Sequence, residues 1–440
     1  MSNSAGTAQL RPSPSRVESS ESRRERLRAA YREVRRRTEG LASRLSPEDA
    51  VVQSMPDASP AKWHLAHTTW FFETFVLTEA APGYRPFDPR FGYLFNSYYN
   101  SVGAQYPRPR RGVLTRPDLD EVRRYRARVD EQMEALLTAA SKEDFESWWS
   151  VVEIGLHHEQ QHQELLLTDI KHLFSCNPLE PAFHEPHDEP VSEPLPLNWH
   201  PYEGGVYWMG HDGSGFAYDC ETPRHEVFQH PFEIASRLVT NGEFLAFIED
   251  RGYERPELWL SEGWTVVNER AWKAPLYWRR EDGRWRVFTL GGMKDVHPAE
   301  PVSHVSFFEA DAYARWRGAL LPRESAWEIA AADLPVEGNF VESERYHPAA
   351  APADGSAGRP LQMFGDLWEW TASPFLPYPG YEPPAGALGE YNGKFMCNQF
   401  VLRGGSCASP RAHLRASYRN FFPPDARWQF TGIRLARMRS

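Results

Sequence analysis

The chain has 440 residues, which is more than one compact core usually holds, so two domains are expected. Hydrophobic residues make up 41% and charged residues 25%, which excludes wholesale disorder and collagen-like repeats. The formal net charge of -11 argues against a general binder of nucleic acid, and no stretch approaches the ~18 uninterrupted apolar residues of a membrane span. Four widely spaced cysteines and an N-terminus without an apolar core predict a cytoplasmic protein with reduced thiols.

The N-terminal part is predicted to be a helical domain that follows a disordered tail. Residues 1–20 are rich in Ser and Pro, which is typical of disorder. Apolar residues at helical spacing predict four helices, over residues 21–41, 59–80, 117–139 and 142–174. Because residues 81–116 form a long second connection, we expect a four-helix bundle spanning residues 21–175. The many arginines of the first helix are interpreted as a solvated face, since the whole chain is acidic.

The composition changes after residue 175. Residues 176–197 contain six prolines without helical or strand periodicity and are predicted to be an extended linker. Over residues 198–440, short apolar segments alternate with Gly, Pro and Asn turns, which predicts an α+β domain with little regular structure. The expected strands are VYWMG, HEVFQHPFEIA, EPVSHVSF, FVLRGGS and GIRLARM, and the expected helical stretches are residues 241–252 and 306–334.

The segment HHEQQHQE carries the strongest chemical signal. His158 and His162 are spaced i, i+4 on a predicted helix, so their rings project from one face and can share a metal ion. His157 points about 100° away from that face. A third ligand must come from another helix, where WHLAH offers His64 and His67. Facing helices assemble metal sites in bundle cores, so we expect a metal centre there.

The spacing alone leaves the metal open. Three imidazoles with free coordination positions suit catalytic zinc and also ferrous iron. The His-Glu-x-x-His order of zinc proteases is absent, because Glu159 is followed by two glutamines before His162. Glu164 is a candidate to orient a ligand through a hydrogen bond, with a solvent-facing helix residue as the alternative.

Motifs over nearly the whole chain after residue 40 resemble two known domain families. QSMPDASPAKWHLAHTTWFFE and LHHEQQHQELLLTDIKH resemble the DinB-like four-helix bundle in its sulfoxide-synthase branch. The C-terminal half resembles the formylglycine-generating-enzyme fold, which is akin to C-type lectins, through EGGVYWMG, ETPRHEV, EPVSHVSFFEADAYARWRG, LPRESAWEIAA, GDLWEWT, VLRGGS and FTGIRLAR. This pairing of domains is similar to the iron-dependent sulfoxide synthases of ergothioneine biosynthesis.

The resemblance implies an oxygen-dependent reaction at Fe(2+). Enzymes of this family join the sulfur of cysteine or γ-glutamylcysteine to the imidazole of hercynine (Nα-trimethylhistidine), using O2. FNSYYNSVGAQYPRPRRG and YRNFFPPDARWQFTGIRLAR look most like the branch that takes free cysteine. The resemblance assigns the iron ligands to His67, His158 and His162. It prefers His67 to His64 because the family pattern Trp-x-Leu-Ala-His ends at His67.

Both substrates need recognition groups. Hercynine carries a quaternary ammonium and a carboxylate, so its cavity requires aromatic or carbonyl partners and a hydrogen-bond donor. Gln161 looks like the family's hercynine-contacting glutamine, and Asn420 and Phe421 match partners from the second domain. An arginine fork best meets the carboxylate of cysteine, for which Arg108 and Arg111 are candidates. We therefore expect the site in the cleft between the two domains.

A proton donor is expected near the iron, because oxygen reduction and carbon–sulfur coupling both move protons. Tyr98 and Tyr99 are the candidates by their resemblance to the cysteine-using branch. Tyr378 resembles the position where other branches keep a tyrosine and is the second choice.

Other functions share parts of this pattern. Selenoneine synthases couple a selenosugar to hercynine, and ovothiol-type synthases use histidine, on the same architecture. Oxidation of a protein cysteine to formylglycine would need a reactive cysteine pair, and the contexts of Cys397 and Cys407 give no sign of a lowered thiol pKa. A lectin-like binding module with a structural metal would need four ligands, and the sequence offers three good ones.

Overall fold

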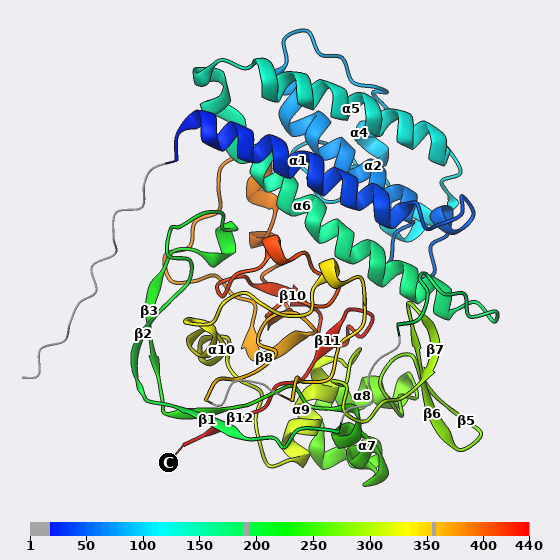
Figure 1. Ribbon diagram of the computed structural model, residues 1–440, viewed down its shortest axis with the longest axis vertical. Coiled ribbons are helices and arrows are strands. Elements are labelled where there is room, and N and C mark those ends of the chain that lie inside the picture. The colour runs from blue at the N-terminus through cyan, green and yellow to red at the C-terminus, as the bar shows by residue number, and fades with distance from the viewer. Residues whose placement is uncertain (1–17, 188–192, 354–357, 440) are drawn as a thin grey trace, which may run out of the picture.

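The computed structural model describes residues 18–187, 193–353 and 358–439, with a helical N-terminal half above a mixed C-terminal half (Figure 1). Disorder is predicted for residues 1–20, of which residues 1–17 lie outside the described part of the chain. The predicted division of the chain at residues 176–197 stays a prediction. Over the described ranges, no helix combines the length and apolar character that a membrane crossing requires.

The N-terminal half is the expected four-helix bundle. Its main helices are α1 (Ser20–Ala42), α2 (Ala61–Phe72), α5 (Leu119–Ala139) and α6 (Lys142–Ser175). The chain continues past α2 through a π-helical turn (Glu73–Leu77) into α3 (Thr78–Ala80), and the long connection holds α4 (Phe91–Leu94) and a 3-10 helix (Arg108–Val113). Helix α6 packs against α1 and α2, and α2 also packs against α5.

Local chemistry explains where α6 begins and how closely it approaches α2. The side chain of Ser141 accepts a hydrogen bond from the backbone N–H of Asp144, which caps the first turn. Gly155 faces the aromatic rings of α2, where an added Cβ would lie 2.6 Å from Phe72 Cε1. Because only glycine fits there, the helix turn that precedes His158 lies directly against α2.

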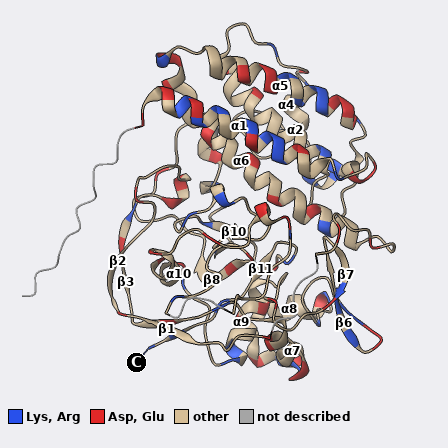
Figure 2. Cartoon of the chain, in the orientation of Figure 1, with Lys and Arg blue, Asp and Glu red and all other residues tan. Residues whose placement is uncertain are grey.

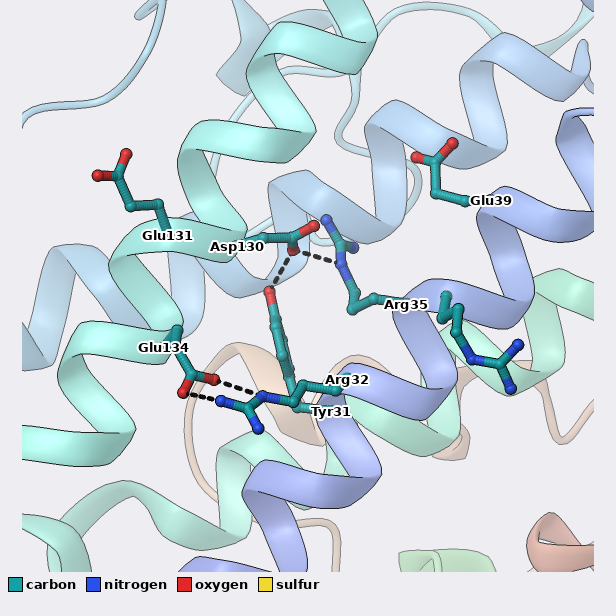
Figure 3. A pocket seen from close by; sticks show the side chains of 8 residues that line it. Tyr31, Arg32, Arg35, Glu39, Asp130, Glu131 and Glu134 are labelled. Atoms are coloured by element: carbon teal, nitrogen blue, oxygen red, sulfur yellow. Dashed lines mark hydrogen bonds and ion pairs between the residues drawn. The ribbon is translucent and has the colours of Figure 1, made fainter.

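Figure 2 shows basic residues along α1 and acidic residues on the neighbouring α5. Three arginines of α1, Arg23, Arg32 and Arg35, form ion pairs with Glu146, Glu134 and Asp130. Figure 3 shows a hollow of about 440 Å³ between α1 and α5, in which Arg32 pairs with Glu134. The hydroxyl of Tyr31 and Nε of Arg35 both donate to Asp130 Oδ1, at 2.7 and 2.6 Å. The arginine-rich face, which was expected to be solvated, therefore takes part in ionic contacts with both α5 and α6, with Arg35 buried and Arg32 exposed.

The C-terminal half is a mixed domain of short strands and short helices, as predicted. Its strands are β1 (Trp199–Tyr202), β2 (Gly205–Met209), β3 (His225–Gln229), β4 (Phe232–Ala235), β5 (Trp278–Glu281), β6 (Arg284–Thr289), β7 (Gly292–Asp295), β8 (Trp368–Pro374), β9 (Phe400–Arg403), β10 (Asn420–Phe422), β11 (Thr431–Gly432) and β12 (Ala436–Met438). They form sheets in the orders β1-β4-β12, β2-β3, β5-β6-β7 and β10-β9-β8-β11. Its helices are α7 (Asn241–Glu249), α8 (Ser261–Glu269), α9 (Phe307–Trp316) and α10 (Glu324–Ala331).

Two predictions for this half are wrong in detail. The segment EPVSHVSF lies outside the named strands, because His304 has a φ of 60°, which an extended strand does not accommodate. The stretch 306–334 contains two helices, since the chain leaves α9 at Gly318, which has a φ of 66°. Helix α8 and strands β5 to β7 have no counterpart among the predicted elements.

Candidate active site

Three buried histidines from two bundle helices converge on one point. His67 comes from α2, and His158 and His162 come from α6. One ring nitrogen from each lies within 4.8 Å of the others, and His67 Nε2 is 3.1 Å from His158 Nε2. The structure thus brings together the three residues that the resemblance assigned to the metal.

Hydrogen bonds on the far side of two of these rings select their tautomers. His67 Nδ1–H donates to the carbonyl oxygen of Phe95 at 2.6 Å, which leaves a lone pair on Nε2. Asp169 Oδ2 accepts from His64 Nε2 at 3.0 Å, so the other nitrogen of His64 is an acceptor. That nitrogen, Nδ1, lies 2.8 Å from His162 Nδ1 and accepts a hydrogen bond from it, which leaves the lone pair of His162 Nε2 free for a metal. His64 therefore orients a candidate ligand.

Burial keeps the three rings neutral, which is the form that binds a metal. Removal from water lowers the pKa of His67 and of His162 well below the usual value, and the neighbouring His158 lowers both further. Burial likewise lowers the pKa of His158 to about 3. None of these rings has to lose a proton at neutral pH before a cation enters.

The cluster fits a catalytic metal ion better than a closed structural one. Among the described residues, its ligand set is these three histidines, without a fourth His, Cys, Asp or Glu. Structural zinc sites are usually closed by four protein ligands, whereas three imidazoles leave positions for small molecules. The donor set suits zinc and ferrous iron alike.

A cavity of about 330 Å³ lies beside the cluster, with walls from both halves of the chain. His162 forms part of its wall. The cavity is lined by most of the residues predicted to bind the substrates or to donate a proton: Tyr98, Arg108, Arg111, Gln161, Asn420 and Phe421. Tyr99 is not in the wall, and neither is Tyr378, which packs under the guanidinium of Arg419 and accepts a hydrogen bond from Arg403.

Arg111 presents a buried guanidinium to this cavity without a carboxylate partner. It lies 3.4 Å from the centre of the Trp63 ring and donates from Nη1 to Ser59 Oγ at 2.9 Å. No carboxylate of the described chain lies within ion-pair distance of it. Burial and the nearby Arg108 lower the pKa of Arg111, and the carboxylate of Asp169 offsets only part of this effect. Such a group attracts the carboxylate of a small ligand.

Two tyrosines of the C-terminal half hold the amide of Gln161. Its Nε2 donates to Tyr418 Oη at 2.7 Å, and its Oε1 accepts from the hydroxyl of Tyr391. Both tyrosines line the cavity, and sequence reasoning missed them. The position of Tyr418, two residues before Asn420 in YRNFF, was the available signal.

Tyr98 and Tyr99 differ in their access to the cavity. Tyr98 is half-buried and lines the wall, whereas Tyr99 is fully buried behind it, with the two hydroxyls 3.4 Å apart. Desolvation raises the pKa of both phenols, so both keep their protons at neutral pH. Lys394 of the C-terminal half donates a hydrogen bond to the carbonyl oxygen of Tyr98 and thereby ties the loop that carries this tyrosine to the C-terminal half.

Glu164 neither faces solvent nor forms a hydrogen bond with one of the three histidines. Its carboxylate is buried and accepts hydrogen bonds from Trp368 Nε1 at 2.8 Å and from the hydroxyls of Ser406 and Ser409. These donors all come from the C-terminal half, so Glu164 joins α6 to that domain beside the cavity. Burial raises the pKa of Glu164.

The two cysteines considered for formylglycine chemistry lie in different surroundings. Cys407 is buried, and burial raises the pKa of its thiol well above the usual value. Cys397 is exposed on the surface. A buried protonated thiol is a poor nucleophile and metal ligand.

Comparisons with known proteins follow the same division of the chain. Residues 201–439 match the sulfatase-modifying factor enzyme 1-like domain, and residues 30–166 match the DinB superfamily. The hercynine oxygenase of Mycolicibacterium smegmatis is 33% identical over 414 residues, which cover 87% of this chain and 92% of that protein. The hercynine oxygenase of Mycobacterium tuberculosis is 34% identical over 404 residues, covering 87% and 91%. Ergothioneine biosynthesis protein 1 of Schizosaccharomyces pombe is 27% identical over 237 residues, covering 50% and 28%.

Proposed function

The chain belongs to the hercynine oxygenase family, and from that premise we propose that it is a non-haem Fe(II)-dependent sulfoxide synthase of ergothioneine biosynthesis. It joins the sulfur of L-cysteine, or of γ-glutamylcysteine, to the imidazole of hercynine. O2 is the oxidant: one oxygen atom ends on sulfur, and the other leaves as water with the hydrogens of the C–H and S–H groups. The observation that carries the proposal is the open three-histidine cluster beside a cavity lined by the buried guanidinium of Arg111, which has no ion-pair partner among the described residues.

His67, His158 and His162 would hold ferrous iron, which would activate O2 and bring the two organic substrates together. The chain's own residues bind and orient the organic substrates. Arg111 is buried and already fixed by Trp63, so it can receive the carboxylate of cysteine in a forked pair with little loss of side-chain freedom. Arg108 is exposed and donates to the carbonyl oxygen of Asp57, which makes it the weaker candidate.

Hercynine is met by the wall that the C-terminal half contributes. Phe395, Phe421 and Phe422 line the cavity and offer aromatic surfaces to a quaternary ammonium group. Gln161 has one amide hydrogen left after its bond to Tyr418, and that hydrogen is available for the carboxylate of hercynine. Asn420 lies on the same wall.

Tyr98 is the group that donates the proton in this proposal. Its hydroxyl is protonated at neutral pH and lies on the cavity wall, and Tyr99 supports it from behind. A phenol in an apolar pocket can release a proton during the reaction and recover it from solvent afterwards.

The test is aerobic incubation of the iron-loaded protein with hercynine and one of three donors in parallel: cysteine, γ-glutamylcysteine or a selenosugar. We expect mass spectrometry to detect the hercynine–cysteine sulfoxide as the main product. Exclusive coupling of the selenosugar would contradict the proposal in favour of a selenoneine synthase, and histidine in place of hercynine tests the ovothiol-type reaction. The His67→Ala variant, prepared in parallel, should form none of these products.

A further inference from the structure

A chain of hydrogen bonds leads from Gln161 out of the cavity and into the domain interface. Tyr418 Oη accepts from Gln161 Nε2 at 2.7 Å and lies 3.1 Å from His413 Nε2. His413 Nδ1 lies 2.9 Å from Nδ1 of His157, which is half-buried on α6. His413 is itself buried in the 3-10 helix η10 (Arg411–His413) and does not line the cavity.

The tautomer of His413 sets the direction in which these hydrogen bonds donate. A neutral histidine has one nitrogen that donates and one that accepts. If His413 Nδ1–H donates to His157, then His413 Nε2 accepts, and the single proton of the Tyr418 hydroxyl is committed to it. Tyr418 can then only accept from Gln161, which places the amide nitrogen toward Tyr418. Tyr391 enforces the same orientation, because its hydroxyl donates to Gln161 Oε1.

The opposite tautomer would give a different cavity. If His413 donated from Nε2, the proton of Tyr418 would have to turn toward the cavity or toward Gln161. Tyr418 would then no longer be committed to accepting from the amide, and Gln161 would depend on the hydroxyl of Tyr391 alone for its orientation. The direction of the Tyr418 hydroxyl therefore depends on His413, which does not line the cavity.

We infer that His413 is a positioning residue, which through Tyr418 fixes the amide of Gln161 so that one N–H faces the carboxylate of hercynine. This inference rests on the proposed function, since hercynine is the ligand. The packing around Tyr418 suits such a role. The centre of its ring lies 4.8 Å from the centre of the His413 ring and 5.4 Å from that of Trp368, and these neighbours limit the movement of Tyr418.

The test compares two substitutions that keep different halves of the imidazole. In His413→Gln the amide stands at the ε position and can still accept from Tyr418. In His413→Asn the amide stands at the δ position and can reach only His157. Calorimetry under anaerobic conditions measures the affinity of the iron-loaded protein for hercynine and for its analogue without the carboxylate, Nα-trimethylhistamine.

We expect His413→Asn to weaken hercynine binding about tenfold, the cost of one hydrogen bond to a charged group, and to leave binding of the analogue within about twofold. His413→Gln should bind both ligands like the wild type. An equal loss for both ligands, or no loss for either, would overturn the inference. If His413→Asn fails to fold, Tyr418→Phe carries the same comparison and should show the same ligand-selective loss.

The outcome for the wild type separates the two proposals. A wild-type protein that does not bind hercynine contradicts the proposed function and this inference together. A wild-type protein that binds and couples hercynine, while His413→Asn binds both ligands normally, contradicts only the positioning role.

Discussion

His64 and His162 face each other through their Nδ1 atoms at 2.8 Å, although only His162 belongs to the three-histidine cluster. The carboxylate of Asp169 accepts a hydrogen bond from His64 Nε2–H and so sets the direction of both bonds. Two histidines spaced three residues apart on α2, His64 and His67, therefore have different roles: one orients a ligand and the other offers a lone pair.

The hydrogen bonds from Asp169 through His64 to His162 predict that substitutions of His64 and His67 weaken metal binding to different extents. His67→Ala, which removes a ligand, should abolish binding of ferrous iron. His64→Ala should retain iron with an affinity lowered about 10- to 100-fold, because His162 loses the partner that selects its tautomer. Chelator competition under anaerobic conditions measures both affinities. His157→Ala is the control and should bind iron like the wild type, and iron loss in His64→Ala but not in His67→Ala would refute the ligand assignment.

The proton donor is tested by the products of Tyr98→Phe. Because Tyr98 lines the cavity, its loss should slow carbon–sulfur coupling by about 10²–10⁴-fold and divert cysteine toward its sulfinic acid, with iron content unchanged. The ratio of the two products under saturating hercynine, read by mass spectrometry, is the measurement.

Tyr99→Phe and Tyr378→Phe provide the comparison. Tyr99 acts from behind Tyr98, so its loss should shift the ratio less, and Tyr378 lies outside the cavity and should leave it unchanged. If Tyr98→Phe keeps the parental ratio and rate, the proton comes from another group.

The bundle depends on a buried carboxylate next to the cluster. Glu159 is fully buried and accepts from Arg35 Nη1 at 2.9 Å and from Arg126, which together hold its pKa at about 2. Glu159→Gln removes the buried carboxylate that both guanidinium groups share, while Arg35 keeps Asp130 and Arg126 keeps Glu39, so the free energy of unfolding should fall by about 3 kcal/mol, the lower end for a broken buried ion pair. Urea denaturation is the measurement. Glu134→Gln, at a partly exposed pair with Arg32, should cost less than about 1 kcal/mol, and equal costs would contradict the argument.

A buried lysine between the two halves predicts a pH dependence of stability. Lys171 Nζ is 2.7 Å from His304 Nε2 and lies over the rings of Tyr277 and Phe430, and burial lowers its pKa from 10.5 to about 7. Between these values the unfolded chain binds a proton that the folded chain does not, so this residue makes stability rise with pH by about 1.4 kcal/mol per unit.

Lys171→Met should remove that slope. The variant should gain most over the wild type near pH 7, and the gain should shrink toward pH 10. Unfolding free energies at pH 7, 8 and 9 measure it, with the exposed Lys273→Met as the control. Parallel curves for Lys171→Met and the wild type would show that the charge of Lys171 does not oppose folding.

Much of the bundle could be predicted because helical periodicity and caps are local properties. The i, i+4 spacing of His158 and His162 is sufficient to place both rings on one face of α6. The C-terminal half was harder, since its strands have two to seven residues and depend on partners far along the chain. His304 illustrates this: its left-handed backbone interrupts a segment whose apolar alternation is typical of a strand.

By itself, the amino-acid sequence determined the bundle and the nature of the second domain, because these depend on short-range patterns and motifs. The choice of His67 over His64 came from a family resemblance. Only the tertiary structure decided which side chains act together. It placed Asp169 behind His64, Tyr418 and Tyr391 on Gln161, and the charge of Arg111 over Trp63. The hydrogen bond between Gln161 and Tyr418 joins residues 257 positions apart, and no local spacing encodes such a contact. A residue's tautomer, charge and orientation follow from its neighbours in space, and these exist only once the two halves have packed together.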